Sequence, residues 1–103
     1  MGHNFRELNV WKNAMTIVED SYVLASNLPA EERFSLVSQI NRSAISIPSN
    51  IAEDSGRTTD KEFTHFLNIS LSSAYELETQ LILAGRLFKI EIKEIVEKLH
   101  ELQ

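Results

Sequence analysis

The stretch SIPSNIAEDSGR, residues 46–57, places a proline inside what otherwise has the pattern of a long helix. Around Pro48 lie polar side chains of the kind from which sites are built: Ser46, Ser49, Asn50, Glu53 and Arg57. A proline in a helix interior removes one backbone hydrogen bond, here to the carbonyl of Ala44, and favours a bend. The stretch is therefore either a functional site or a bent helix whose polar residues organise packing.

The helix that contains this proline is expected to begin at residues 30–32, after Pro29, and to end near Ser55, with Gly56 as a left-handed cap. Apolar side chains at three- and four-residue spacing give it one buried face: Val37, Ile40, Ala44, Ile47 and Ile51. The opposite face is mostly serine and amide: Ser35, Gln39, Arg42, Ser46, Ser49 and Glu53, with Asn50 to one side. Because serine and amide residues are poor helix formers in water, we expect this face to meet another helix, a neighbouring subunit or a ligand, with packing favoured.

Three further helices follow from the same periodicity. The first is expected from Phe5 or Leu8 to Asn27, with the apolar face Trp11, Ala14, Met15, Val18, Tyr22 and Ala25. The third begins in TTDKE, where Thr59 and Glu62 have capping-box spacing. Its face is Phe63, Phe66, Leu67, Ser70, Ala74, Leu77, Leu81, Ala84 and Phe88. The fourth starts near Glu91 and has the face Ile92, Ile95, Leu99 and Leu102.

Four helices joined by short loops predict an all-α fold, an antiparallel up-and-down four-helix bundle with a short fourth helix, as a single domain over residues 1–103. At a rise of about 1.5 Å per residue, the second and third helices reach roughly 35 to 40 Å, whereas the segment after Ile90 reaches only about 20 Å. Part of the groove between the longer helices is then left uncovered. We expect another copy of the protein to cover it.

One flank of the third helix supports this expectation. Leu71, Tyr75 and Ile82 fall together outside the core face, where a monomeric bundle would place charged or amide side chains. Scattered exposed apolar residues are common, so chance is the alternative. We predict a subunit interface that contains Leu71, Tyr75 and Ile82, together with Ser46 and Ser49.

The composition restricts the classes of function. The chain has no cysteine, and 10 basic against 15 acidic residues give a net charge of −5, which disfavours strong non-specific binding to nucleic acid. No apolar run is long enough for a membrane span, the first residues do not resemble a secretory signal, and we expect a cytoplasmic location. The histidines, His3, His65 and His100, lack metal-binding spacing, and no nucleophile or phosphate-binding motif is present, so a protein without cofactor that is not an enzyme is predicted.

Candidate contacts to nucleic acid or another partner centre on cations near the opening stretch. Arg57 and Lys61 share the loop between the second and third helices, and Arg42 lies on the polar face before it. If a ligand site exists, its candidate residues are Arg42, Asn50, Glu53, Arg57 and Lys61. The structural alternative is a set of solvated charges and ion pairs between helices.

The order of three segments carries a resemblance: FRELNVWKNAM (5–15), LPAEERFSLVSQINRSAISIPSNIAEDSGR (28–57) and KEFTHFLNISLSSAYELETQLILAGRL (61–87). It is similar to the 23S rRNA-intervening-sequence protein family of small bacterial four-helix-bundle proteins. The resemblance implies a ring of five subunits and an association with DNA inserted in large-subunit ribosomal RNA genes. It also implies kinship with a pentameric accessory protein of diversity-generating retroelements, and it brings no catalytic residues.

Two functions remain open at this point. The first is an oligomeric accessory protein associated with RNA or DNA, which the resemblance and the cations favour. The second is a ring that serves as a scaffold for a protein partner, which the acidic charge and the apolar flank favour.

Overall fold

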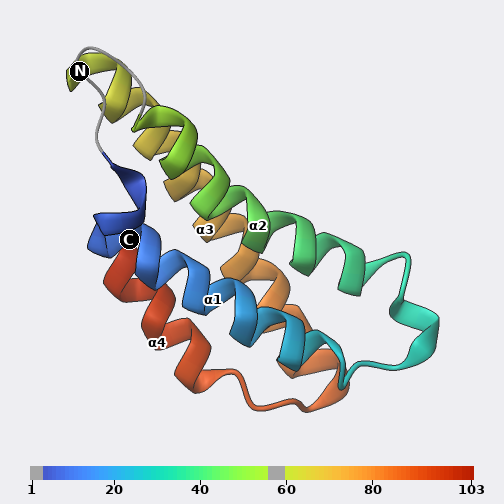
Figure 1. Cartoon of the computed structure of the whole chain (residues 1–103). Coiled ribbons are helices and arrows are strands. Elements are labelled where there is room, and N and C mark those ends of the chain that lie inside the picture. Colours follow the sequence, from blue (N-terminus) through green and yellow to red (C-terminus); the bar gives the residue numbers. More distant parts are fainter. Residues whose placement is uncertain (1–3, 56–59) are drawn as a thin grey trace.

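Two long helices form a hairpin against which the rest of the chain packs. The structure is a computed structural model that describes residues 4–55 and 60–103; the side chains at 54 and 60–68 are outside this description. Its elements are η1 (Phe5–Glu7), α1 (Asn9–Ala25), η2 (Ala30–Glu32), α2 (Leu36–Asp54), α3 (Asp60–Phe88) and α4 (Lys93–Leu102). Figure 1 shows consecutive helices running in opposite directions, which is the predicted all-α bundle.

The helices differ in length as the sequence predicts. By the same helical rise, the 29 residues of α3 span about 43 Å, and the 10 residues of α4 span about 15 Å. In Figure 1 the α2–α3 hairpin therefore extends beyond α4 at the end where the two long helices are joined. α1 lies between α2 and α4, α3 also lies between α2 and α4, and the backbones of α1 and α3 do not approach each other closely in the described part of the chain.

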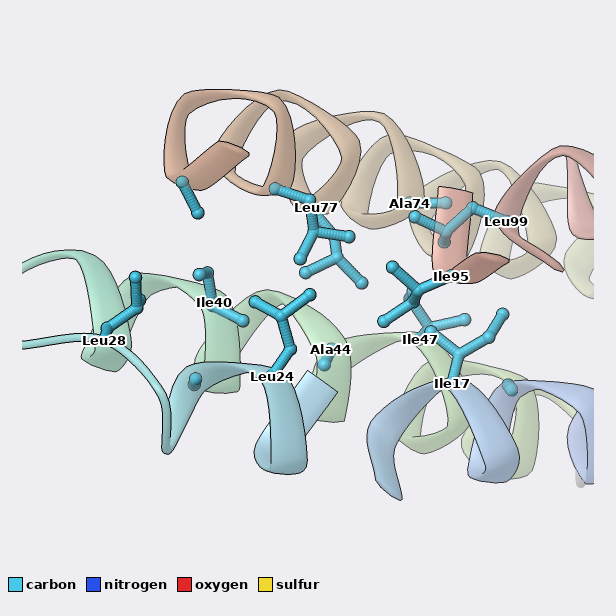
Figure 2. Packing of buried hydrophobic residues seen from close by; sticks show 14 of the residues in the cluster. Ile17, Leu24, Leu28, Ile40, Ala44, Ile47, Ala74, Leu77, Ile95 and Leu99 are labelled. Carbon is cyan, nitrogen blue, oxygen red and sulfur yellow. The ribbon is translucent and has the colours of Figure 1, made fainter. Parts of the chain in front are cut away.

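The core lies where the inner faces of the four helices meet. α2 contributes Ile40, Ala44, Ile47 and Ile51, as predicted, and α3 contributes Ala74, Leu77, Leu81 and Ala84. Ile95 and Leu99 of α4 complete the core, and Figure 2 shows them pointing toward Ile17 and Ile47. Three predicted core residues of α3, Phe63, Phe66 and Leu67, lie outside the described side chains, as do Gly56 and the capping box of Thr59 and Glu62.

The inner face of α1 differs from the prediction. Ala14, Ile17, Ser21, Leu24 and Ala25 are buried, whereas Met15 and Tyr22 are exposed and Trp11 and Val18 are half-buried. The apolar side chains of α1 cover a wider part of its circumference than the core can bury. The side of the helix with Ile17 and Leu24 faces the core. The predicted face was therefore rotated: Tyr22 lies at the surface, and Trp11 and Val18 pack at the edge of the core.

The second helix begins later than predicted. Residues 30–32 form only the 3₁₀ turn η2. The backbone of Ser35 is not helical, at φ −121° and ψ −99°, and α2 starts at Leu36. The sequence from Ala30 to Ser35 offers one large apolar side chain, Phe34, and it is 88% exposed. Without a buried face, this segment has no packing to hold it in an α-helix.

The turn between α3 and α4 uses a left-handed residue. Lys89 has φ 56°, and its backbone N–H donates to the carbonyl of Gly85 at 3.0 Å, which ends α3. α4 then begins at Lys93, two residues after the predicted start near Glu91, and the side chain of Glu91 accepts a hydrogen bond from the Lys93 N–H at 2.9 Å.

Candidate functional site: the outer surfaces of the bundle

Part of the opening stretch packs inside the chain itself. Ser46 lies on the side of α2 that faces α3, and its hydroxyl is 2.8 Å from that of Ser73. Asn50 is one turn further along α2, and its amide donates to the Ser46 carbonyl at 2.7 Å and to the Ser46 hydroxyl at 3.0 Å. The amide and hydroxyls therefore satisfy one another beside Pro48, which is itself buried.

These polar contacts between α2 and α3, which we call the seam, continue in both directions along the two helices. Ser43 donates to the carboxylate of Glu76 at 2.9 Å, and buried Ser70 donates to the Ile47 carbonyl at 3.1 Å. Small hydroxyl side chains let the two backbones approach and still supply hydrogen bonds. One side of the serine-rich face of α2 therefore meets another helix of the same chain, which is one of the three partners that the sequence left open.

Three of the five candidate contact residues, Arg42, Asn50 and Glu53, have side chains that the structure describes, and these three are spread along α2. Arg42 and Asn50 are separated by two turns of α2, about 12 Å of helical rise, and Asn50 belongs to the seam whereas Arg42 is exposed. Glu53 is exposed further along α2. Arg57 and the side chain of Lys61 lie outside the described residues. Nucleic-acid or partner contact by these residues stays a prediction.

An apolar groove lies between α1 and α2. Its walls are Phe5, Trp11, Met15 and Val18 on one side, and Ile45, Pro48, Ser49 and Ala52 on the other, around a volume of about 380 Å³. Phe5 and Trp11 meet edge to face at one end, with ring centroids 5.3 Å apart, and the Arg6 guanidinium lies 5.2 Å from the Phe5 centroid. Ser49 is the only hydroxyl in this lining, so the groove suits an apolar rather than a charged occupant.

Sequence reasoning missed this groove although its residues were visible. The predicted core face of the first helix includes Trp11, Met15, Val18 and Tyr22, and Ile45 belongs to neither predicted face of the second helix. The sequence does contain an indication of this groove. α1 carries apolar side chains on two sides, one with Ile17 and Leu24 and one with Trp11 and Met15, and together they are wider than the single apolar face of a typical surface helix.

The predicted flank of α3 is partly exposed. Tyr75 is 53% exposed, whereas Leu71 and Ile82 are half-buried. Leu83, 43% exposed, follows Tyr75 and Thr79 at four-residue steps, so it continues the same outward line of α3. We call Leu71, Tyr75, Ile82 and Leu83 the α3 flank. Of the other two predicted interface residues, Ser49 lines the groove and Ser46 bonds within the seam.

α4 is held to the bundle by polar contacts as well as by its two buried residues. Lys98 donates to Asp20 of α1 at 2.6 Å, and this hydrogen bond raises the pKa of Lys98. On α3, Glu78 accepts from the Gln103 amide at 2.8 Å and lies 3.1 Å from His100 Nε2. The hydrogen bonds from Gln103 and then His100 lower the pKa of the Glu78 carboxyl, against the opposing effect of its burial.

The Glu78 contacts predict that the stability of the fold decreases at low pH. Since the pKa of Glu78 is lower in the folded state, its carboxylate stabilises the fold above the ordinary value of 4.5, and this contribution is lost as the pH falls through the folded-state value. Glu78→Gln should therefore reduce the loss of stability between pH 7 and pH ~3.5, measured by urea unfolding at fixed protein concentration. Glu97→Gln, an exposed acid of α4, is the matched control. An unchanged pH dependence in Glu78→Gln would contradict this role.

Two features are absent from the described part of the chain. No helix there is both long and apolar enough to cross a membrane. No group of three or more histidine, cysteine, aspartate or glutamate side chains there could hold a metal ion.

Comparisons with known proteins agree with this geometry. A crystal structure of a protein of unknown function from the S23 ribosomal protein family of Bacteroides thetaiotaomicron superposes with a TM-score of 0.81 at 29% identity, over 90% of each chain. No curated protein matches the chain. The sequence model of the 23S rRNA-intervening sequence protein family matches residues 6–103, which is nearly the whole chain. The chain therefore belongs to the 23S rRNA-intervening sequence protein family.

Proposed function

We propose that this chain is a non-catalytic accessory protein of the cytoplasm that acts as a homo-oligomer. The observation that carries the proposal is the exposed apolar surface on two separate sides of the bundle, the groove between α1 and α2 and the α3 flank. Contiguous apolar surface outside the core is typical of association sites. The ring of five that the resemblance implies is the assembly we propose.

A surface for RNA is the first mode of action that we propose for this assembly. The printed name of the family refers to the intervening sequence of 23S rRNA, and Arg42 presents a cation on the outward face of α2. Within residues 4–55 and 60–103, no ion pair engages the Arg42 guanidinium. A ring would repeat this cation once in each subunit, and repeated phosphate contacts bind RNA even when the single chain is acidic.

The test is the affinity for single-stranded RNA, measured by fluorescence anisotropy over a range of salt concentrations. We expect affinity to fall steeply with salt, and Arg42→Glu to weaken binding about tenfold and to flatten the salt dependence. Lys93→Glu makes the same charge change at the start of α4 and should leave affinity near that of the wild type. Binding that does not depend on salt, or that Arg42→Glu leaves unchanged, would contradict a phosphate contact at Arg42.

A scaffold for a protein partner is the second mode of action. The net charge of −5 and the nearly uncharged walls of the groove favour it. It predicts an oligomer that purifies free of nucleic acid and shows no RNA binding at low salt. The absorbance ratio of the purified oligomer at the nucleic-acid and protein wavelengths separates the two modes.

A further inference from the structure

The last helix, α4, is attached to the bundle by less buried surface than the other three helices. Of its side chains only Ile95 and Leu99 are almost completely buried, whereas α2 and α3 each place four described apolar side chains in the core. α2 packs directly against both α1 and α3, so these three helices stay joined to one another without α4. In Figure 1, α4 lies along α1 at the outside of the α2–α3 hairpin.

Polar contacts in the second half of α4 add to this attachment. Lys98 donates to Asp20 of α1 at 2.6 Å, Gln103 donates to Glu78 of α3 at 2.8 Å, and His100 lies 3.1 Å from Glu78. We call these contacts the latch. Water reaches them, since the side chain of Lys98 is 35% exposed and that of Asp20 37%. Water can therefore replace each contact when it breaks, and the latch opens without leaving a buried charge unpaired.

The turn that joins α3 to α4, residues 89–92, is suited to act as a hinge. Lys89 has φ 56°, a left-handed conformation that is costly for a residue with a Cβ atom. Close packing on α3 holds the turn in place: a Cβ atom at Gly85 would lie 3.4 Å from the Ile90 carbonyl oxygen and 3.4 Å from Ile92 Cδ1. The packed turn thus maintains an unfavourable backbone conformation, and Lys89 can leave this conformation when the turn lifts from Gly85.

We propose that α4 is a strap that opens as one unit about residues 89–92 while α1, α2 and α3 stay folded. The short buried face sets a low cost for opening, the latch holds the closed position at the far end, and the strained turn favours release. Because Ile95 and Leu99 point toward Ile17 and Ile47, opening uncovers the apolar core on this side of the bundle. The strap controls access to that surface, whether or not the chain associates.

Hydrogen exchange of single amides in the full chain, followed by NMR at one protein concentration, tests the strap. We expect the hydrogen-bonded amides of α4 to share one protection factor, at least about tenfold below that of the slowest amides of α2 and α3. Ser46→Ala removes a hydrogen bond of the seam, which the open state would retain. It should therefore lower the protection of the slowest α2 and α3 amides about fivefold and leave that of α4 unchanged.

Two further variants test the latch and the hinge. Gln103→Ala removes one latch contact and should lower the protection of α4 about threefold. Glu97→Ala truncates an exposed side chain of the same helix that makes no latch contact, and it should leave the protection of α4 unchanged. Lys89→Gly should raise the protection of α4 about threefold, because glycine adopts the left-handed conformation without strain.

Two results would overturn the proposal. If the amides of α4 are protected as strongly as the slowest amides of α2, and Ser46→Ala lowers both alike, α4 opens only when the whole molecule unfolds. If protection along α4 declines residue by residue toward Gln103 and does not respond to Lys89→Gly, the helix frays from its end and is not a strap.

Discussion

Replacing Leu77 with alanine should lower the free energy of unfolding by about 3 kcal/mol, the largest stability effect we expect from a single truncation of the core. Leu77 is completely buried, and Figure 2 shows it pointing from α3 toward Leu24 and Ile40, between the helices that pack on either side. The loss combines the transfer of the missing methyl groups with the cavity that close-packed neighbours leave behind.

The measurement is urea unfolding of both proteins at the same concentration, since association would otherwise shift apparent stability. Leu87→Ala removes the same atoms from the surface of the same helix, where the side chain is 63% exposed and outside the α3 flank, and should cost less than about 1 kcal/mol. Similar losses at Leu77 and Leu87 would mean that α3 is turned differently in the bundle.

Replacing Tyr75 with aspartate should reduce the mass in solution from a multiple of 11.8 kDa to that of one chain. The ring of Tyr75 is half exposed in the single chain, so the substitution should leave the helix content unchanged. In the assembly, however, the new carboxylate would be buried in an apolar interface without a partner, at a cost of several kcal/mol per interface. Tyr75→Phe keeps the ring and should assemble normally. An oligomer that survives Tyr75→Asp would remove the α3 flank from the interface.

The predictable part of the fold is the part that local periodicity determines. The inner faces of α2, α3 and α4 follow from the spacing of Ile40, Leu77 and Ile95, because each helix has one dominant apolar stripe. α1 was misjudged because its apolar arc is wider than a stripe, and only packing against α2 and α4 decides that Ile17 faces inward and Met15 outward.

The candidate site was less predictable for the same reason. The serine and amide face of α2 indicated packing, but the sequence does not say which helix meets which side of it. In the structure, Ser46 and Asn50 form hydrogen bonds in the seam with α3, whereas Arg42 and Ser49 are exposed. The groove between Trp11 and Ile45 depends on the relative placement of two helices, a long-range property that no local pattern contains.

Self-association is the central claim, and the mass of the wild-type protein in solution tests it most directly. Light scattering would be recorded behind size-exclusion chromatography, over a range of protein concentrations and at low and high salt. We expect a multiple of 11.8 kDa that high salt does not dissociate, because the contact is mainly apolar. A mass of 11.8 kDa at every concentration would contradict the account, and would mean that the short α4 suffices to close the bundle within one chain.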